Sequence, residues 1–254
     1  KEDYAQAVQF FEKSLHYPVD PEYVGEAGFW SGEAYSLGRK YELAIPLYEH
    51  ALGALSKAEL VKAARYGLGY AQYNLQQYGK ALISFKDFVA KSVPSELNYT
   101  DGIIRLADCY YVSKSYQEAL SFYRKAIQLN SSDADYAHLQ SGIIQVIQRK
   151  YTDAGSEFDL VIKNPASRYA EDALFQRAQM DFELSNYAAA VTNFTRLINS
   201  APSSRLLPYA YTRRAAAYFN LRNYDQTAND YIAVLEKFPT HPATQDLLLP
   251  LQES

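Results

Sequence analysis

A tyrosine returns at a nearly constant interval along this sequence, and the period limits the folds that the chain can adopt. Seven tyrosines stand 37, 37, 38, 35, 36 and 37 residues apart in the 254-residue chain: Tyr4, Tyr41, Tyr78, Tyr116, Tyr151, Tyr187 and Tyr224. An alanine follows three residues after each tyrosine, with Thr227 as the one exception, and an aromatic residue follows after seven. A fixed period of this length is typical of an array built from one supersecondary unit.

The spacing within each unit fits an α-helix with one buried stripe. Residues at positions i, i+3 and i+7 lie on the same face of a helix. The alanine lets a neighbouring helix approach closely, and the rings fill the space around that contact. A small residue nine positions before six of the tyrosines marks a preceding helix: Gly32, Gly69, Ala107, Gly142, Ala178 and Ala215. Each unit is therefore predicted to be two helices joined by a tight turn.

These units resemble the tetratricopeptide repeat, a helix-turn-helix of about 34 residues with small, tyrosine, alanine and aromatic positions in this order. The resemblance covers essentially the whole chain and implies an all-α fold, a right-handed α-solenoid of antiparallel helix pairs. The period here is nearer 37 residues. Three units also depart from the pattern at the position that carries Tyr35, Tyr110 and Tyr218 elsewhere, where they have Gln72, Gln145 and Asp181.

The period predicts one array over residues 1–254. We expect a lone helix at about 3–15, a partial helix at about 242–252, and six helix pairs between them, at about 23–55, 58–91, 96–129, 132–163, 168–200 and 205–237. Because both ends interrupt the pattern and natural arrays usually close with capping units, the chain is expected to be a fragment of a longer protein.

The longer units carry a second, narrower resemblance. A lead-in such as residues 167–175 is similar to those of bacterial cell-envelope repeat proteins, among them the Tol-Pal accessory protein and the outer-membrane β-barrel assembly lipoprotein. The likeness implies a place in the periplasm or at the outer membrane in preference to the cytoplasm. No integral membrane segment is expected, since no stretch approaches the roughly 18 apolar residues that such a helix needs.

Composition and motifs argue against chemistry within this chain. The formal net charge is −4 and neither half is basic, so nucleic acid is not an expected partner. One cysteine and four scattered histidines leave no metal-ligand cluster, and no phosphate-binding or nucleophile motif occurs. Cys109 lies beside the small Ala107 and is expected to be an inert packing residue. We therefore expect no cofactor and no enzyme activity.

In tetratricopeptide repeats the first helix of each unit lines a concave face, and the resemblance places the binding surface there. Counting from the repeated tyrosines puts these residues at or near that lining: Tyr66, Tyr70, Tyr73, Tyr111, Phe175, Phe182, Tyr209, Arg213 and Phe219. Tyrosine suits peptide binding because its ring offers apolar area at low entropy cost together with a hydroxyl. About half of these rings are expected to reach solvent, and the others to be core.

Three functions are open on these grounds. The first is a protein–protein interaction scaffold that holds a peptide segment or a partner protein along the concave groove. The second is a targeting or assembly array of a larger envelope machine or enzyme. The third is a glycan-binding module, because aromatic rings also stack on sugars. An interval without acidic residues, from 184 to 224, contains Arg213 and could serve a carboxylate-bearing ligand.

Overall fold

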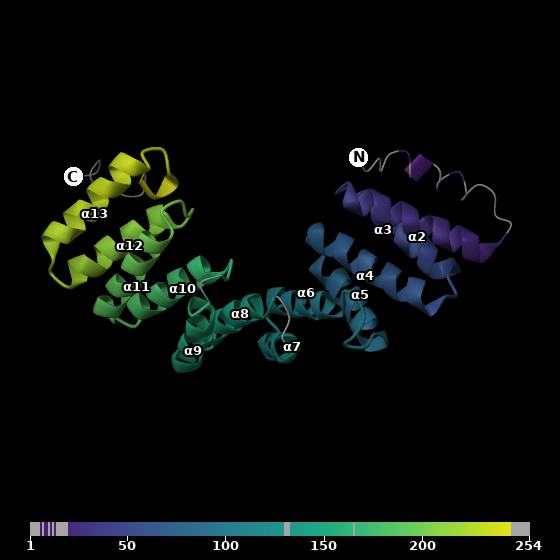
Figure 1. The fold of residues 1–254 in the computed structure, drawn as a ribbon, viewed down its shortest axis with the longest axis horizontal. Coiled ribbons are helices and arrows are strands. Elements are labelled where there is room, and N and C mark those ends of the chain that lie inside the picture. The colour runs from purple at the N-terminus through teal and green to yellow at the C-terminus, as the bar shows by residue number, and fades with distance from the viewer. Residues whose placement is uncertain are drawn as a thin grey trace. The chain divides into compact units, whose positions relative to one another are not determined.

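The computed structural model describes residues 20–129, 133–164 and 166–244, together with Gln6, Val8, Gln9, Phe11 and Lys13. All regular elements among these residues are helices (Figure 1). Their bounds are α2 (Pro21–Leu37), α3 (Tyr41–Ala54), α4 (Ala58–Asn74), α5 (Tyr78–Lys91), α6 (Tyr99–Val112), α7 (Tyr116–Gln128), α8 (Ala134–Ile147), α9 (Tyr151–Ile162), α10 (Ala170–Glu183), α11 (Tyr187–Ser200), α12 (Leu207–Asn220) and α13 (Tyr224–Lys237). The all-α prediction is confirmed for this part of the chain, whereas the helices expected at 3–15 and 242–252 fall mostly outside it.

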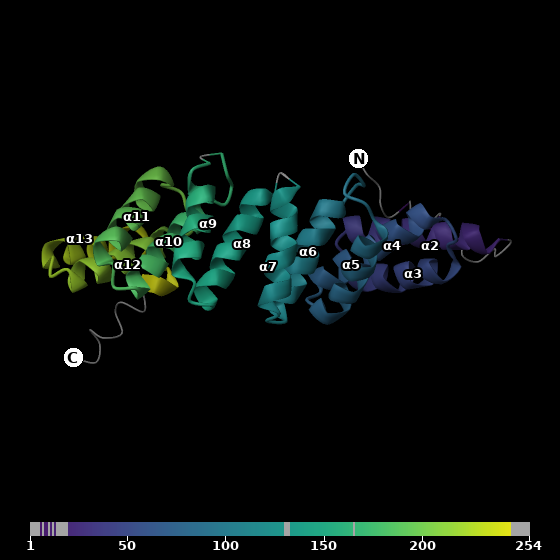
Figure 2. The ribbon, with the colours of Figure 1, turned by 90° about the horizontal axis from the view of Figure 1, so that it is seen from below.

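The helices pack as consecutive pairs in two compact units. Unit 1 comprises Lys1–Ala134 and unit 2 Asp135–Ser254. Within a unit, the first helix of a pair contacts the second, as α2 contacts α3, and the second contacts the first helix of the next pair, as α3 contacts α4. The first helices also touch one another, α2 with α4, α4 with α6, and α10 with α12 (Figure 2). The first helices therefore share one face of each unit.

The repeated stripe forms the core of the first five pairs. Its alanines are fully buried at Ala44, Ala81, Ala119, Ala154 and Ala190. Its second aromatic residues are fully buried at Tyr48, Phe85, Tyr123, Phe158 and Phe194. At the one exception, Thr227, the hydroxyl donates to the Asn223 carbonyl oxygen at 3.0 Å, so the buried polar atom is satisfied.

The small residue of the first helix is required by the ring of the second. A Cβ atom added to Gly142 would lie 2.5 Å from the Phe158 ring, and one added to Gly69 would lie 3.0 Å from the Phe85 ring. Both rings are fully buried, so neither can move aside easily. The recurring spacing thus brings the small residue of the first helix into contact with the ring of the second, and this contact closes the helix pair.

Each turn within a pair contains one residue in the left-handed backbone region, two positions before the repeated tyrosine. The six residues have φ between 57° and 61°: Arg39, Gln76, Lys114, Arg149, Ser185 and Arg222. The residue that follows donates its N–H back into the first helix, as Lys40 does to the Tyr35 carbonyl oxygen at 2.8 Å. This bond recurs in all six turns at 2.8–2.9 Å and fixes the angle between the two helices.

Two of the three departures from the repeat pattern are matched by changes on the facing helix. The variable position of the first helix contacts the residue six positions after the repeated tyrosine. Where the first helix has a tyrosine, Tyr110 stacks on Phe122 with ring centroids 5.6 Å apart. In two of the three units with a polar residue there, the pair becomes a hydrogen bond: Ser84 donates to Gln72 at 2.8 Å, and Asn193 donates to Asp181 at 2.9 Å. Both exchanges keep the buried polar atoms paired. The third, Gln145, makes no such bond, and its side-chain oxygen is buried without a hydrogen-bond partner among the described residues.

Gly67 gives a test of the packing between consecutive pairs in unit 1. A Cβ atom there would lie 2.6 Å from Cζ of the buried Tyr48 ring, so Gly67→Ala should destabilise unit 1 by about 1 to 3 kcal/mol through overpacking. Gly53 lies on the neighbouring helix with open space around its Cα, and Gly53→Ala should stabilise by about 0.5 to 1 kcal/mol. Urea unfolding measures both changes. Equal shifts in the same direction would contradict the packing described.

Candidate functional site

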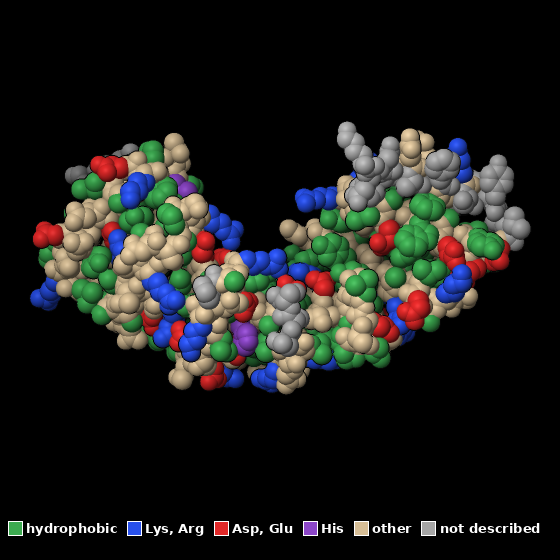
Figure 3. Space-filling view, viewed as in Figure 1, with side chains coloured by type: hydrophobic (Ala, Val, Ile, Leu, Met, Phe, Trp, Pro, Cys, Tyr) green, Lys and Arg blue, Asp and Glu red, His purple; other side chains and the backbone are tan. Residues whose placement is uncertain are grey.

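The candidate site is the first-helix face of each unit, which we define as the surface of α2, α4 and α6 in unit 1 and of α8, α10 and α12 in unit 2. Hydrophobic side chains reach the surface of both units among charged ones (Figure 3). All nine residues predicted from the sequence lie on these first helices. The structure brings them into two different environments, one in each unit.

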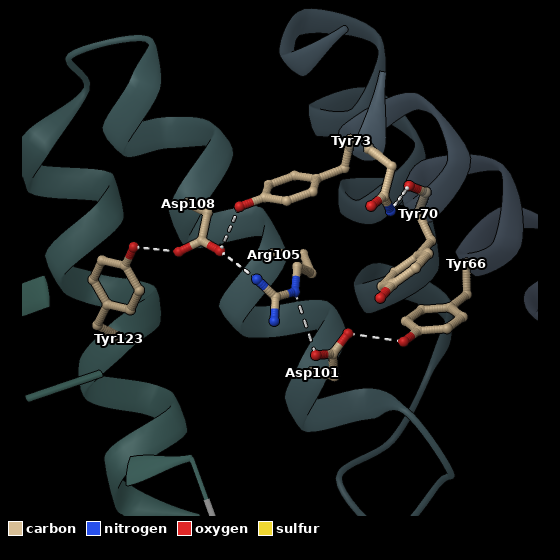
Figure 4. A network of polar contacts seen from close by, with 8 residues as sticks. Tyr66, Tyr70, Tyr73, Asp101, Arg105, Asp108 and Tyr123 are labelled. Carbon is tan, nitrogen blue, oxygen red and sulfur yellow. Dashed lines mark hydrogen bonds and ion pairs between the residues drawn. The ribbon is translucent and has the colours of Figure 1, made fainter. Parts of the chain in front are cut away.

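In unit 1 the predicted tyrosines of α4 meet a charged row on α6 (Figure 4). The Tyr66 hydroxyl donates to Asp101 at 2.8 Å, and the Tyr73 hydroxyl donates to Asp108 at 3.1 Å. Arg105 stands between the two carboxylates, with Nη1 2.9 Å from Asp108 and Nε 3.4 Å from Asp101. Its guanidinium also lies 5.4 Å from the centroid of the Tyr73 ring. The two helices are therefore joined by a closed polar network.

Asp108 is the centre of this network. Its side chain is only 5% exposed. It accepts from Tyr73, from Arg105, and at 2.6 Å from the hydroxyl of Tyr123 on α7. Burial raises the pKa of Tyr73, and the Asp108 carboxylate raises it further, so this hydroxyl stays protonated and donates. Asp108, itself on α6, thus links α4, α6 and α7 of unit 1.

The network shows which tyrosine hydroxyls of unit 1 are already bonded within the protein. Tyr66 and Tyr73 are half-buried, and their hydroxyls are already bonded to α6. Tyr111 is half-buried with its ring tilted against Tyr116, 6.1 Å between centroids. Only Tyr70 is exposed among the four tyrosines predicted for this unit. The local pattern placed all four on the face but could not show which of them are engaged.

In unit 2 the predicted rings divide between core and surface. Phe175 packs edge-on against Phe194, and Phe182 packs edge-on against Tyr187, with centroids 5.8 and 5.4 Å apart. Both phenylalanines are half-buried. Tyr209 and Phe219 of α12 are exposed, and Phe219 is the more exposed of the two at 58%. These two rings are therefore the accessible aromatic area on this face.

Arg213 lies between the two exposed rings in the sequence and differs from its equivalent in unit 1. Its guanidinium is 6.0 Å from the centroid of the Phe182 ring. Arg105, at the same repeat position, is held by two aspartates, whereas Arg213 is exposed and makes no hydrogen bond or ion pair within the described ranges. It is therefore an exposed cation on α12, beside the Phe182 ring and one turn after Tyr209.

A buried ion pair lies behind this surface. Arg214 binds Asp230 of α13 through two parallel contacts of 2.6 and 2.9 Å, and it donates to the Thr195 hydroxyl at 2.9 Å. Burial alone would lower the pKa of Arg214, but the bonds to Asp230 outweigh it and the pKa is raised. Arg214 is therefore a structural cation that holds α12 against α13, and it is not available to a ligand.

Trp30 is an exposed residue of the first-helix face that the sequence reasoning missed. It is the single tryptophan of the chain and is 46% exposed on α2. Its position, two residues before Gly32, is the repeat position of Arg105 and Arg213. The spacing that placed Arg213 on the lining would have found Trp30 if the count had been extended to α2.

The groups that bear on catalytic chemistry among the described residues are Cys109 and the histidine and acidic side chains. Burial raises the pKa of the Cys109 thiol to about 12, so it is a packing residue at neutral pH. Within residues 20–129, 133–164 and 166–244 there is no group of three histidine, cysteine or acidic side chains that could hold a metal ion. Over the same part of the chain no helix combines the length and the apolar character needed to cross a membrane.

Comparison with known families and structures agrees with the repeat. Models of the tetratricopeptide repeat match residues 32–95, 101–133 and 172–204. The C-terminal part of a TPR repeat-containing protein from Cytophaga hutchinsonii is similar over 96% of this chain and 94% of its own, with a TM-score of 0.76 and 16% identity. No curated protein matches the sequence.

Two further solved structures are similar. PilW, described as a widely conserved type IV pilus biogenesis factor, has a TM-score of 0.67 and 17% identity, covering 89% of this chain and 98% of its own. A tetratricopeptide repeat protein from Parabacteroides merdae has a TM-score of 0.69 and 18% identity, covering 90% and 87%. Identities this low establish a shared solenoid fold, and the site must be argued from the residues of this chain.

Proposed function

Since this chain belongs to the tetratricopeptide repeat family, we propose that it is a non-catalytic scaffold that binds a peptide segment or a partner protein along its first-helix faces. Proteins with this fold generally mediate protein–protein interaction and assembly. The observation that carries the proposal is the set of exposed side chains on the first-helix face of unit 2. There α12 carries the exposed rings of Tyr209 and Phe219 and the exposed guanidinium of Arg213, for which the described residues offer no hydrogen bond or ion pair.

These three side chains provide the contacts that dominate peptide binding. Aromatic rings and arginine are enriched among the few interface residues that carry most of the binding energy. Truncating one such ring typically costs about 2 kcal/mol or more. On α4 of unit 1, by contrast, Tyr66 and Tyr73 are bonded to α6, and Tyr70 is the exposed ring of the three. The first-helix face of unit 1 also exposes Trp30 on α2, so both units present aromatic rings to a partner, and unit 2 adds the guanidinium of Arg213.

We also propose that the partner belongs to a bacterial envelope assembly, in the periplasm or at the outer membrane. Two observations support this setting. The sequence resembles envelope repeat proteins of the Tol-Pal accessory and β-barrel assembly lipoprotein types, and PilW is described as a pilus biogenesis factor. In this setting the chain is the assembly array of a larger machine.

Peptide selection with matched variants tests the proposal. A phage-display library of random linear peptides is enriched on the 254-residue chain, and enriched peptides are titrated against one first-helix variant and one second-helix variant per unit. The first-helix variants are Tyr70→Ala and Phe219→Ala, and the second-helix variants are Ile83→Ala and Ile232→Ala, which also remove exposed side chains. Phe219→Ala or Tyr70→Ala should weaken binding about 30-fold, and the second-helix variants should leave it unchanged.

Two results would overturn the scaffold function. One is loss of binding only in the second-helix variants, which would place recognition on the opposite side of each unit. The other is the absence of any enriched peptide together with Phe219-dependent retention of the chain on insoluble peptidoglycan. That result would favour the glycan-binding function instead.

A further inference from the structure

Two carboxylates of unit 1 occupy the same position in successive first-helix sequences but differ in their partners. Glu33 follows Gly32 and Asp108 follows Ala107, so each stands one residue after the small residue of its repeat. Each accepts a hydrogen bond of 2.6 Å from a tyrosine of the second helix of its pair, Glu33 from Tyr48 and Asp108 from Tyr123. The two sites are therefore built on one plan.

The two sites differ in whether a cation accompanies the carboxylate. Three residues before Asp108 stands Arg105, whose Nη1 lies 2.9 Å from the carboxylate. Three residues before Glu33 stands Trp30. Across the described ranges no lysine, arginine or histidine forms an ion pair with Glu33, and its hydrogen-bond partner is the Tyr48 hydroxyl. Glu33 thus has the hydroxyl of the shared plan but lacks the guanidinium.

A partly buried carboxylate without a cation is costly to a folded protein. Glu33 is half-buried, and desolvation raises its pKa, an effect that the Tyr48 hydrogen bond only partly opposes. Other acidic residues of the first helices in unit 1 are compensated, as Glu26 is by Lys57 and Asp101 is by Arg105. Glu33 is therefore a carboxylate of the first-helix face whose charge no cation of the described residues compensates.

The indole beside Glu33 is suited to receive a cation. Trp30 is exposed, and its ring is held edge-on by the buried Phe29 at 4.8 Å. Residues i, i+3 and i+7 share a helix face, so Trp30, Glu33 and the exposed Leu37 form one stripe along α2. Tryptophan is the strongest cation–π partner, and the planar guanidinium stacks on aromatic faces while it also pairs with carboxylates.

We propose that Trp30 and Glu33 form a receptor for an arginine side chain of the partner, whose guanidinium takes the place that Arg105 occupies beside Asp108. The inference rests on the proposed scaffold function and names the chemistry of one contact in it. Arginine is favoured over lysine because the equivalent internal occupant is a guanidinium. The exposed Leu37 then provides apolar area for the residue next to the arginine.

The single tryptophan makes the site directly observable. A blocked Gly-Arg-Gly tripeptide is titrated into the 254-residue chain while the fluorescence of Trp30 is recorded. We expect a saturable change with a dissociation constant of about 1 to 10 mM, as befits one isolated side chain. The same peptide with citrulline, the neutral isostere of arginine, should give no saturation over that range, and the lysine peptide should bind more weakly.

Two carboxylate variants on the same helix separate the site from a general charge effect. Glu33→Gln removes the charge but keeps an acceptor for the Tyr48 hydroxyl, so the fold should persist while arginine affinity falls at least about tenfold. Glu26→Gln removes a carboxylate that is already paired with Lys57, and it should leave the affinity unchanged. Equal affinity in wild type and Glu33→Gln, or an equal loss in Glu26→Gln, would overturn the proposal.

A third variant places an arginine of the chain itself beside Glu33. In Trp30→Arg the new guanidinium should pair with Glu33, as Arg105 pairs with Asp108, and calorimetry should then detect no binding of the arginine peptide. Retained binding by this variant would refute the assigned place. If arginine binding fails while Phe219-dependent peptides are still selected, only this inference falls. If arginine binds Trp30 but no peptide is selected, the scaffold function fails and the receptor stands.

Discussion

Replacing Asp108 by alanine is expected to lower the free energy of unfolding of unit 1 by about 3 to 5 kcal/mol, the usual cost of breaking a buried charge pair. The side chain is nearly inaccessible and accepts from the Tyr73 hydroxyl, the Tyr123 hydroxyl and the Arg105 guanidinium. Alanine would leave all three donors without this acceptor, although the guanidinium would keep its ion pair with Asp101. Since the donors come from three helices, the loss should spread through α4, α6 and α7.

Amide hydrogen exchange of the full chain measures this effect by region. Protection should fall in α4 to α7 and change little in α10 to α13, because a repeat array transmits stability mainly to neighbouring repeats. Asp101→Ala is the control, since it removes a more exposed carboxylate of the same network, and it should cost about 1 kcal/mol. Equal losses in the two variants would show that Asp108 is not the centre of the network.

The fold of this chain was predictable because its determinants are local and repeated. The tyrosine, the alanine and the second ring lie within eight consecutive residues, and the small residue lies nine before them. Helix periodicity converts such spacings into a buried stripe without knowledge of distant contacts. The structure confirms the stripe at Ala119 and Tyr123, both fully buried, and at Ala44 and Tyr48.

The turns were less accessible to sequence reasoning. Their left-handed positions carry residues such as Arg39 and Ser185, not the glycine or asparagine that usually signals this conformation. A left-handed residue with a side chain costs about 1 to 2 kcal/mol, which the surrounding helix contacts must offset. The identity of these residues does not indicate a left-handed turn. The one regular feature that marks them in the sequence is their constant distance of two positions from the repeated tyrosine.

The candidate site was predictable as a face but not as a set of free side chains. The counting rule placed Tyr66 and Phe219 on first helices, as found. Whether a side chain is engaged depends on a residue about one repeat away, as Tyr66 depends on Asp101, 35 residues later. No local pattern encodes such a pair. The same limit separates Arg105, which is neutralised by two aspartates, from Arg213, which has no ion pair among the described residues.

In unit 2 we expect Asp230→Ala to cost about 3 to 5 kcal/mol, because it would leave the Arg214 guanidinium buried without its carboxylate. The two side chains are only 13% and 5% exposed and share two parallel contacts, the strong geometry for this pair. Thermal unfolding, with hydrogen exchange of α12 and α13, measures the loss. The exposed pair of Arg205 and Asp172 is the control, and Asp172→Ala should cost at most about 1 kcal/mol.

A double variant then separates the need for a charge pair from the need for a filled space. Arg214→Met combined with Asp230→Leu replaces both charges by apolar groups, so no charge is left uncompensated. We expect it to recover most of the stability lost in Asp230→Ala, since apolar replacement of a buried ion pair is often neutral or stabilising. Thr195 loses its Arg214 donor but can rotate its hydroxyl to another acceptor. A double variant as unstable as Asp230→Ala would mean that the pair sets the packing of α12 on α13 through its hydrogen bonds, and that the uncompensated charge is not the cause of the loss.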